Sequence, residues 1–73
     1  MNIDQLIGEN RVRFSHYHQG HLYYRISYLG QPYLFAVPAT EVGEIAVRRD
    51  ESARRFAHYI RLAVHSGTLV KAR

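Results

Sequence analysis

The pattern of apolar and polar residues between Arg11 and Pro38 predicts an antiparallel sheet. Large apolar residues alternate there with polar ones, as is typical of strands that have one buried and one solvated face. We expect strands at Arg11–His18, Leu22–Leu29 and Pro32–Val37. The three strands then form a meander with one apolar face.

Two short loops set the expected pairing of these strands. We place a three-residue loop at Gln19–His21 and a two-residue loop at Gly30 and Gln31. The expected pairs are His18–Leu22, His16–Tyr24, Phe14–Ile26, Val12–Tyr28, Tyr28–Tyr33, Ile26–Phe35 and Tyr24–Val37. A slip of one residue would mix apolar side chains with arginine and serine, so the pattern favours this register.

A helix over residues 50–66 is the clearest element after the sheet. Asp50 is expected to cap it, Glu51 suits the positive end of the helix dipole, and Gly67 is placed to end it. Its apolar stripe consists of Ala53, Phe56, Ala57, Ile60, Ala63 and Val64. We expect this stripe to pack on the sheet face formed by Phe14, Tyr24, Ile26, Phe35 and Val37.

The remaining segments complete one domain over residues 1–73. Residues 1–9 carry apolar residues at helical spacing after Asn2, which indicates a short helix or a turn. The alternation over Glu44–Arg49 indicates a fourth short strand, and residues 67–73 form a tail. The expected fold class is α+β: a three-stranded meander over the sheet region 11–49, or a four-stranded one, packed against one C-terminal helix.

Composition narrows the cellular setting of the chain. With 73 residues and no cysteine, it has no disulfides, so its apolar core suffices alone or a second copy completes it. Residues 1–9 lack a basic stretch followed by an apolar run, and no segment approaches the ~20 apolar residues that span a bilayer. We therefore expect a cytoplasmic protein with no membrane partner.

The sequence gives little support for catalysis, cofactor binding or metal binding. There is no cysteine nucleophile, no Gly-x-Ser-x-Gly, no phosphate-binding glycine loop and no His-Glu-x-x-His. His16, His18 and His21 lie close together in the sequence, but no convincing fourth metal ligand accompanies them. We expect no enzyme activity, no catalytic residues, no cofactor and no metal site, although the sequence does not decide whether these histidines bind metal.

One apolar residue of the predicted helix points away from the predicted core. Leu62 lies on the outer arc with several basic residues, so Arg55, Tyr59 and Leu62 are candidates for a protein interface. Alternatively, Leu69 and Val70 fold back over Leu62 and cover it. Both interpretations remain open at this point.

The outer face of the sheet suggests a different activity. The net charge is +4, and nine of the ten basic residues are arginine, whose guanidinium group binds phosphate through paired hydrogen bonds. Arg13, Tyr17, Tyr23 and Arg25 would place guanidinium groups beside aromatic rings, as in platforms for single-stranded nucleic acid. The same residues are also ordinary on a solvated sheet face.

Several short motifs occur in order between Tyr23 and Leu69: a tyrosine-arginine pair, Val37–Pro38, Gly43, Asp50–Glu51 and Phe56-x-x-Tyr59-Ile60-Arg61. In this order they resemble motifs of small proteins carried by phages and prophages of proteobacteria. The resemblance implies a small protein that binds something in a bacterial host. We expect a non-enzymatic interaction or regulatory protein, a homodimer that binds a host protein, with nucleic-acid binding as the alternative.

Overall fold

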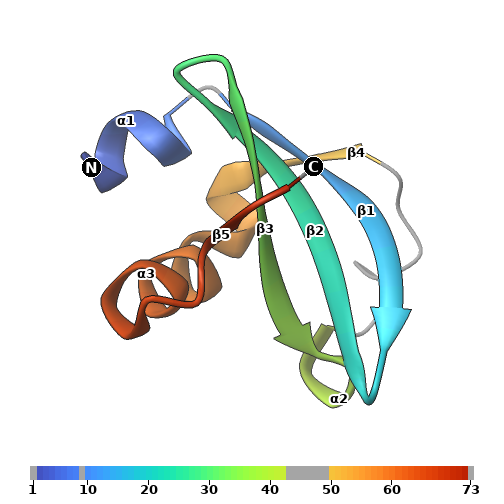
Figure 1. The fold of residues 1–73 in the computed structure, drawn as a ribbon. Coiled ribbons are helices and arrows are strands. Elements are labelled where there is room, and N and C mark those ends of the chain that lie inside the picture. Colours follow the sequence, from blue (N-terminus) through green and yellow to red (C-terminus); the bar gives the residue numbers. More distant parts are fainter. Residues whose placement is uncertain (1, 9, 43–49, 73) are drawn as a thin grey trace.

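The computed structural model describes residues 2–8, 10–42 and 50–72, which form an α+β fold with an antiparallel sheet and a C-terminal helix. The elements are α1 (Ile3–Ile7), β1 (Arg11–His18), β2 (His21–Tyr28), β3 (Gln31–Pro38), α2 (Ala39–Val42), β4 (Asp50–Ser52), the 3-10 helix η2 (Ala53–Phe56), α3 (Ala57–Ser66) and β5 (Val70–Lys71). The sheet has five strands in the order β4-β1-β2-β3-β5, so the expected meander lies at its centre (Figure 1). The expected fold class is confirmed.

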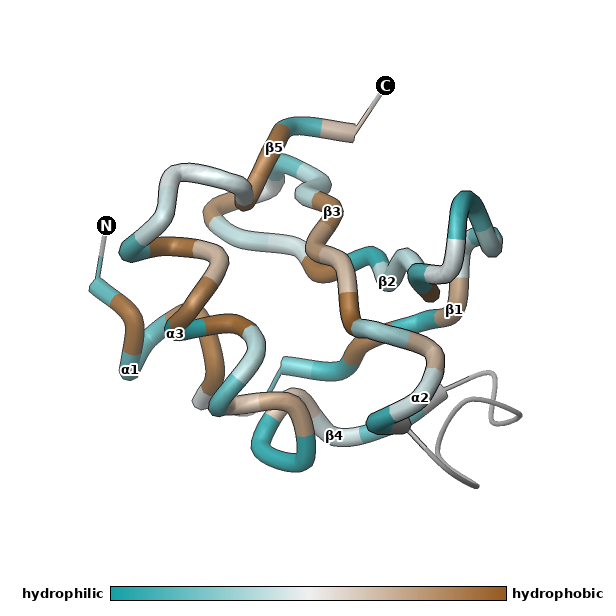
Figure 2. The backbone as a smooth tube through the Cα atoms, turned by 90° about the horizontal axis from the view of Figure 1, so that it is seen from below, coloured by the Kyte–Doolittle hydropathy of each residue, from teal (hydrophilic) through white to brown (hydrophobic). Residues whose placement is uncertain are grey.

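The core lies between the sheet and the helices. In Figure 2 the sheet curves around η2 and α3, with β4 and β5 at its two edges. The buried apolar residues are Leu6, Ile7, Val12, Leu22, Tyr24, Ile26, Phe35, Val37, Ala53, Phe56, Ile60 and Ala63. Aromatic packing centres on Tyr24, whose ring centroid lies 4.6 Å from that of Phe56 and 5.9 Å from that of Phe35.

Phe14 does not belong to this core, contrary to the sequence-based expectation. Its side chain is 39% exposed and contacts Tyr24 edge-on, at a centroid distance of 5.8 Å. The reason is its position on β1, because α3 packs mainly against β3 on the far side of β2. Phe14 therefore lies at the margin of the apolar layer.

The β1–β2 hairpin departs from its predicted register. Its loop is Gln19–Gly20, two residues with φ of 48° and 81°, and not the three-residue loop expected. This matches the primed turns that suit the twist of antiparallel hairpins. A β-bulge at Ser15 then shifts the register again, so that His16 faces Tyr23 whereas Phe14 faces Tyr24.

The bulge decides which face each residue occupies. On the N-terminal side of the bulge, Val12 pairs with Ile26 and Phe14 pairs with Tyr24, a shift of two residues from the expected pairs. A shift of two preserves the faces, because side chains alternate with a period of two. On the C-terminal side of the bulge the shift is one residue, so the residues of β1 from His16 onwards lie on the face opposite to the one predicted.

The β2–β3 hairpin differs from the prediction by a shift of two residues. Its loop is Leu29–Gly30, with φ of 50° and 76°, and the register pairs Tyr24 with Phe35 and Ile26 with Tyr33. The expected loop at Gly30 and Gln31 was therefore wrong. The apolar face is nevertheless the predicted one, since Tyr24, Ile26 and Phe35 are all buried.

The C-terminal helix begins later than predicted. Asp50 and Glu51 belong to β4, which pairs with β1, and the cap of η2 is Ser52, whose side chain accepts a hydrogen bond from the Arg54 N–H at 3.3 Å. The extended pairing with β1 removes Asp50 and Glu51 from the helix, so the expected Asp50 cap was wrong. The end at Gly67 is confirmed, with a left-handed φ of 72°.

The N-terminal residues form a short helix that contributes to the core. The Asn2 side chain accepts a hydrogen bond from the Gln5 N–H at 3.2 Å, as a capping residue does. Leu6 is fully buried, and Asn10 links α1 to the sheet by donating to the carbonyl groups of Leu6 and Ser27. The strand expected at Glu44–Arg49 lies outside the described residues.

Candidate functional site

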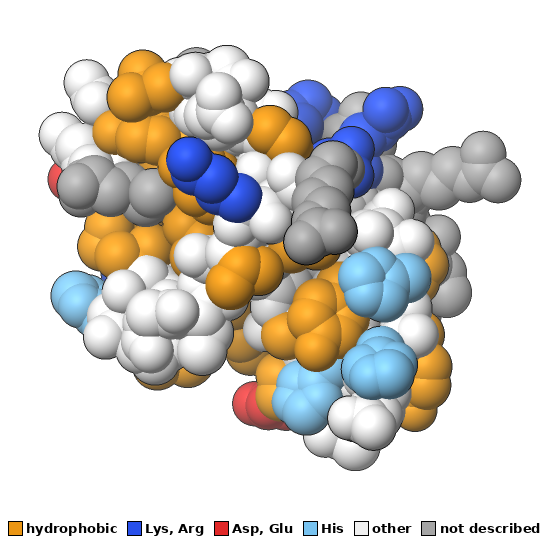
Figure 3. All heavy atoms as spheres, viewed as in Figure 1, with side chains coloured by type: hydrophobic (Ala, Val, Ile, Leu, Met, Phe, Trp, Pro, Cys, Tyr) orange, Lys and Arg blue, Asp and Glu red, His pale blue; other side chains and the backbone are white. Residues whose placement is uncertain are grey.

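A groove of about 650 Å³ lies between α3 and the end of β3. Figure 3 shows the hollow between the lobe that contains α3 and the end of the β1–β2 hairpin, where histidine side chains gather. Its size falls within the ~300–1,000 Å³ of ordinary ligand pockets. We call it the α3–β3 groove, and the lining residues that matter here are Tyr23, Ala36, Tyr59, Leu62 and Val70.

Helix α3 forms one wall of the groove. Ile60 and Ala63 face the core, which leaves Leu62 on the opposite side of the helix with 52% of its surface exposed. Tyr59 is partly buried, packs against the core and reaches the same groove. Two of the three residues expected at a protein interface, Tyr59 and Leu62, are therefore brought together.

The edge of β3 forms the floor of the groove. The Ala72 N–H donates to the Pro32 carbonyl oxygen at 2.9 Å, so the backbone groups of Pro32 point towards β5 and away from β2. Backbone directions alternate along a strand, and the regular β2–β3 register contains no bulge. The N–H and C=O of Leu34 and Ala36 therefore also point away from β2.

Strand β5 covers only part of this edge. It pairs Val70 with Leu34, and continuing that register would pair Thr68 with Ala36. The Thr68 N–H instead donates to the Ala63 carbonyl oxygen at 2.8 Å, in the Schellman motif that ends α3 at Gly67. The β3 edge beside Ala36 is thus left uncovered by β5, and the groove lies there.

The turn after α3 is held in place by side-chain hydrogen bonds. The Ser66 hydroxyl donates to the Leu62 carbonyl oxygen at 2.6 Å and lies 3.1 Å from the Thr68 hydroxyl. Val70 follows at the rim with 52% of its surface exposed. The tail therefore folds back onto β3 and does not cover Leu62, the alternative left open by the sequence.

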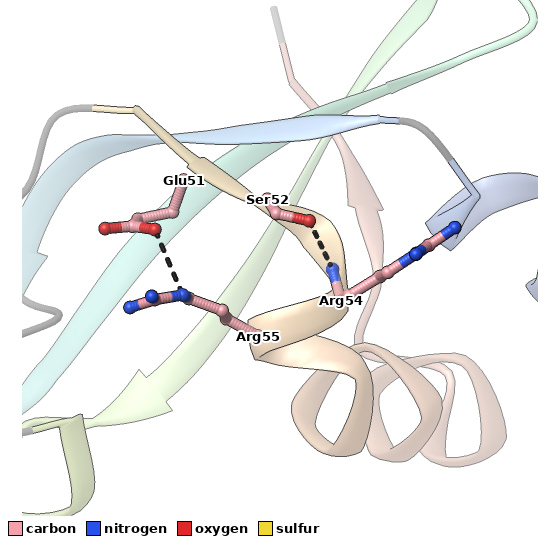
Figure 4. A network of polar contacts seen from close by, with 4 residues as sticks. All are labelled: Glu51, Ser52, Arg54 and Arg55. Atoms are coloured by element: carbon pink, nitrogen blue, oxygen red, sulfur yellow. Dashed lines mark hydrogen bonds and ion pairs between the residues drawn. The ribbon is translucent and has the colours of Figure 1, made fainter.

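Arg55, the third residue expected at the interface, is not among the residues that line the groove. Its Nε atom lies 3.5 Å from Oε2 of Glu51, at the start of the helical segment (Figure 4). Glu51 is 5% exposed, whereas the Arg55 side chain is half exposed. The position of Arg55 is thus explained by a contact within the fold.

The outer face of the sheet brings together three of the four residues expected for nucleic-acid binding. Arg13 and Arg25 are direct cross-strand partners, and Tyr23 lies on the same face of β2 as Arg25. His16 stacks on Tyr23 with ring centroids 4.6 Å apart and planes 2° from parallel. Asp50 occupies the register position on the other side of Arg13.

Tyr17, the fourth of these residues, is on the opposite face, so the prediction was wrong for it. It pairs with Leu22, whose side chain is buried. The bulge at Ser15 is the physical reason, because it reverses the alternation along β1. The same reversal places His16 opposite Tyr23 on the outer face, and not opposite Tyr24 as expected.

The three histidines of the first hairpin lie near its end, and hydrogen-bonding contacts are present for two of them. Nδ1 of His16 lies 2.9 Å from the Ser15 hydroxyl, and Nδ1 of His21 lies 3.2 Å from the Gln19 carbonyl oxygen. Within residues 2–8, 10–42 and 50–72, no group of three histidine or acidic side chains is arranged to hold a metal ion. The His16 and His21 contacts are with residues one or two positions away in the chain.

A buried hydroxyl lies under the sheet. Oη of Tyr24 is buried and has no hydrogen-bond partner among the described residues. Burial raises the pKa of the Tyr24 hydroxyl above its ordinary value of 10.0, and the negative charge of Glu51 raises it further. The neutral form of Tyr24 is therefore favoured in the folded protein.

Sequence reasoning missed the β3 edge. Ala36 and Val70 belong to the groove, but neither was a candidate, because the pattern gave no sign that residues 70–71 pair with β3. The small side chain of Ala36 on the outer face of an apolar strand was a usable signal for a site on this strand. It could not be interpreted from the sequence, because the open edge beside Ala36 exists only where β5 ends its pairing with β3.

Comparisons with known proteins add no relative to this description. No protein-family model matches the chain, and no curated protein and no solved structure matches it. Among the helices of the described residues, none is both long and apolar enough to cross a membrane.

Proposed function

We propose that this chain is a small non-enzymatic protein that acts by binding another polypeptide in the α3–β3 groove. The observation that carries the proposal is the exposure of Leu62 and Val70, each 52%, in one hollow of about 650 Å³. Scattered apolar side chains on a surface need no explanation, but apolar side chains that converge in a concave site are typical of binding sites.

A polypeptide fits this groove better than a second copy of the chain does. In a two-fold symmetric dimer the same surface meets itself, so the surface has to be complementary to itself. A concave groove placed against an identical groove leaves the hollow unfilled. The homodimer expected from the sequence, through the helix face around Tyr59 and Leu62 or through the outer face of the sheet, stays a prediction, and sedimentation velocity at micromolar concentration tests it.

The test of groove binding uses a displayed library of short random linear peptides, selected on the wild-type protein. Leu62→Arg places a charge on the groove wall and is expected to weaken binding of the selected peptides by about tenfold or more. Leu29→Arg makes the same chemical change at the 82% exposed tip of the β2–β3 hairpin, and binding should be unchanged.

Fluorescence anisotropy measures the affinities, and circular dichroism checks that both variants fold. Selection of no peptide by the wild-type protein would contradict the proposal. Equal affinities of the wild-type protein and Leu62→Arg would contradict it as well.

A specific observation also favours the second candidate, binding of single-stranded nucleic acid on the outer face of the sheet. Arg13 and Arg25 are like charges directly opposite each other, a destabilising arrangement that a phosphate group would relieve, in addition to Asp50 at the register position on the other side of Arg13. A hollow of about 420 Å³ is lined by both arginines and by Ser15. The stacked pair of His16 and Tyr23 lies on the same face and offers an aromatic surface to a base.

Titration with a labelled single strand and a labelled duplex at two salt concentrations tests this second candidate. Contacts to phosphate make the logarithm of affinity fall linearly with the logarithm of salt concentration. Arg13→Ala and Arg25→Ala should weaken binding, whereas Arg61→Ala, on α3, should weaken it less. Undetectable binding at low salt would rule out this candidate.

A further inference from the structure

We propose that the occupant of the α3–β3 groove is an extended peptide that adds to the open edge of β3 as a further strand, where β5 stops. This inference rests on the proposed function, because it names the conformation of the bound polypeptide. It adds a chemical requirement that simple apolar docking does not have. The partner must offer backbone N–H and C=O groups in a strand conformation.

The backbone of Ala36 supplies the hydrogen-bonding groups for this pairing. Its N–H and C=O point away from β2, and the Thr68 N–H that would have donated to the Ala36 carbonyl oxygen donates to the Ala63 carbonyl oxygen instead. An uncovered strand edge is a template for pairing with another chain. Ala36 and its neighbour Pro38 line the groove, so a ligand reaches this edge from the hollow.

The walls of the groove supply contacts for side chains. Alternate side chains of an added strand point to opposite faces, so one row meets the wall that Tyr59 and Leu62 form on α3. Leu62 is half exposed, so an apolar side chain of the peptide buries surface that now faces water. The methyl side chain of Ala36 leaves room for the added backbone. We therefore expect peptides with a large apolar residue at alternate positions.

A second copy of this chain is a poorer candidate for the added strand. Pairing β3 with β3 of another copy would bring a second α3, with its own Leu62 wall, towards the edge at which the two strands meet. A peptide without a helix beside it brings no second wall.

Proline substitution at Ala36 tests the inference directly. Ala36→Pro removes the outward N–H, which the fold does not use to pair β3 with β2, so the sheet should tolerate it as an edge proline. We expect the selected peptides to bind Ala36→Pro about tenfold or more weakly than the wild-type protein. Ala36→Ser keeps both the N–H and a small side chain, so it should bind the peptides more tightly than Ala36→Pro does, which separates loss of the N–H from a change of side chain.

A second measurement does not depend on how the variants fold. Selected peptides are methylated at one backbone nitrogen at a time and titrated onto the wild-type protein. Strand addition predicts loss of affinity at alternate nitrogens, because only every second residue points its N–H at β3. Binding should also slow the hydrogen exchange of the Ala36 amide.

The outcomes separate this inference from the proposed function. If Leu62→Arg abolishes binding but Ala36→Pro and methylation at every position leave it unchanged, the groove binds peptides and strand addition is wrong. If Leu62→Arg also leaves binding unchanged, the proposed function fails as well. Loss of binding in Ala36→Pro and at alternate methylated nitrogens supports both.

Discussion

Leu34 and Val70 form the pair at which β5 leaves the edge of β3. Two residues earlier in the tail, Thr68 donates its N–H to the helix terminus and not to the sheet, at 2.8 Å from the Ala63 carbonyl oxygen. The helix cap and the sheet thus compete for the same backbone group, and the cap prevails. The open edge at Ala36 is the consequence.

The amide of Ala36 should exchange its hydrogen faster than that of Val37. The Ala36 N–H points past the end of β5, whereas the Val37 N–H points towards β2, where Leu22 is its partner. Exchange followed by nuclear magnetic resonance on the free protein measures the difference. Equal protection of the two amides would show that something covers the edge, and the open-edge interpretation would be wrong.

Proline at these two positions should have opposite consequences for stability. Ala36→Pro should change the free energy of unfolding by less than about 1 kcal/mol, because no ladder hydrogen bond is lost. Val37→Pro removes a donor to β2 in the middle of the sheet and should prevent folding. Urea unfolding measures both, and a Val37→Pro protein of wild-type stability would contradict the register.

Truncation of Phe56 and of Phe14 should lower the free energy of unfolding by different amounts, because Phe56 lies at the centre of the core and Phe14 at its margin. Phe56 is 1% exposed and contacts Tyr24 and Phe35, so Phe56→Ala should cost about 3–5 kcal/mol. Phe14 is 39% exposed, so Phe14→Ala should cost only about 1–2 kcal/mol. Urea unfolding at neutral pH distinguishes the two, and equal costs would place Phe14 in the core after all.

Tyr24→Phe should stabilise the protein, by about 1 kcal/mol at neutral pH, because it removes a buried hydroxyl that has no hydrogen-bond partner within residues 2–8, 10–42 and 50–72. The raised pKa of Tyr24 means that the folded state holds this proton more tightly than the unfolded state. The contribution of this proton to the free energy of unfolding is complete below the ordinary pKa of 10.0 and is lost as pH rises through the raised pKa of the folded state.

The advantage of Tyr24→Phe over the wild-type protein should therefore grow above pH 10.0. Tyr23→Phe removes one hydroxyl from the outer face and serves as the matched control. Urea unfolding curves at neutral and alkaline pH provide the measurement. A difference between Tyr24→Phe and wild type that does not change with pH would refute the assignment.

Removal of the helix cap should have a measurable but small effect. The Ser52 side chain accepts a hydrogen bond from the Arg54 N–H, so Ser52→Ala should lower the free energy of unfolding by about 1 kcal/mol. Ser52→Asp keeps an acceptor oxygen and should restore most of this loss. A wild-type unfolding midpoint for Ser52→Ala in urea would show that this bond does not stabilise the helix start.

Both hairpins illustrate how far an alternating pattern can predict a sheet. The expected pairs of Ile26 were Phe14 and Phe35, but its partners are Val12 and Tyr33. Each error is a shift of two residues, and such a shift leaves every side chain on the same face of the sheet. A pattern with a period of two residues therefore cannot detect it. The buried face around Ile26 was therefore predicted correctly while the register was not, and the faces were wrong from His16 to His18, beyond the bulge at Ser15.

The amino-acid sequence by itself determined the α+β class, the apolar faces of the meander, the Asn2 cap and the helix end at Gly67. These features follow from interactions between residues close in the chain, which a local pattern records. Only the tertiary structure decided the bulge at Ser15 and the place where β5 meets β3. Those features depend on contacts between distant segments, and the open edge at Ala36 exists because two such segments meet over a limited length.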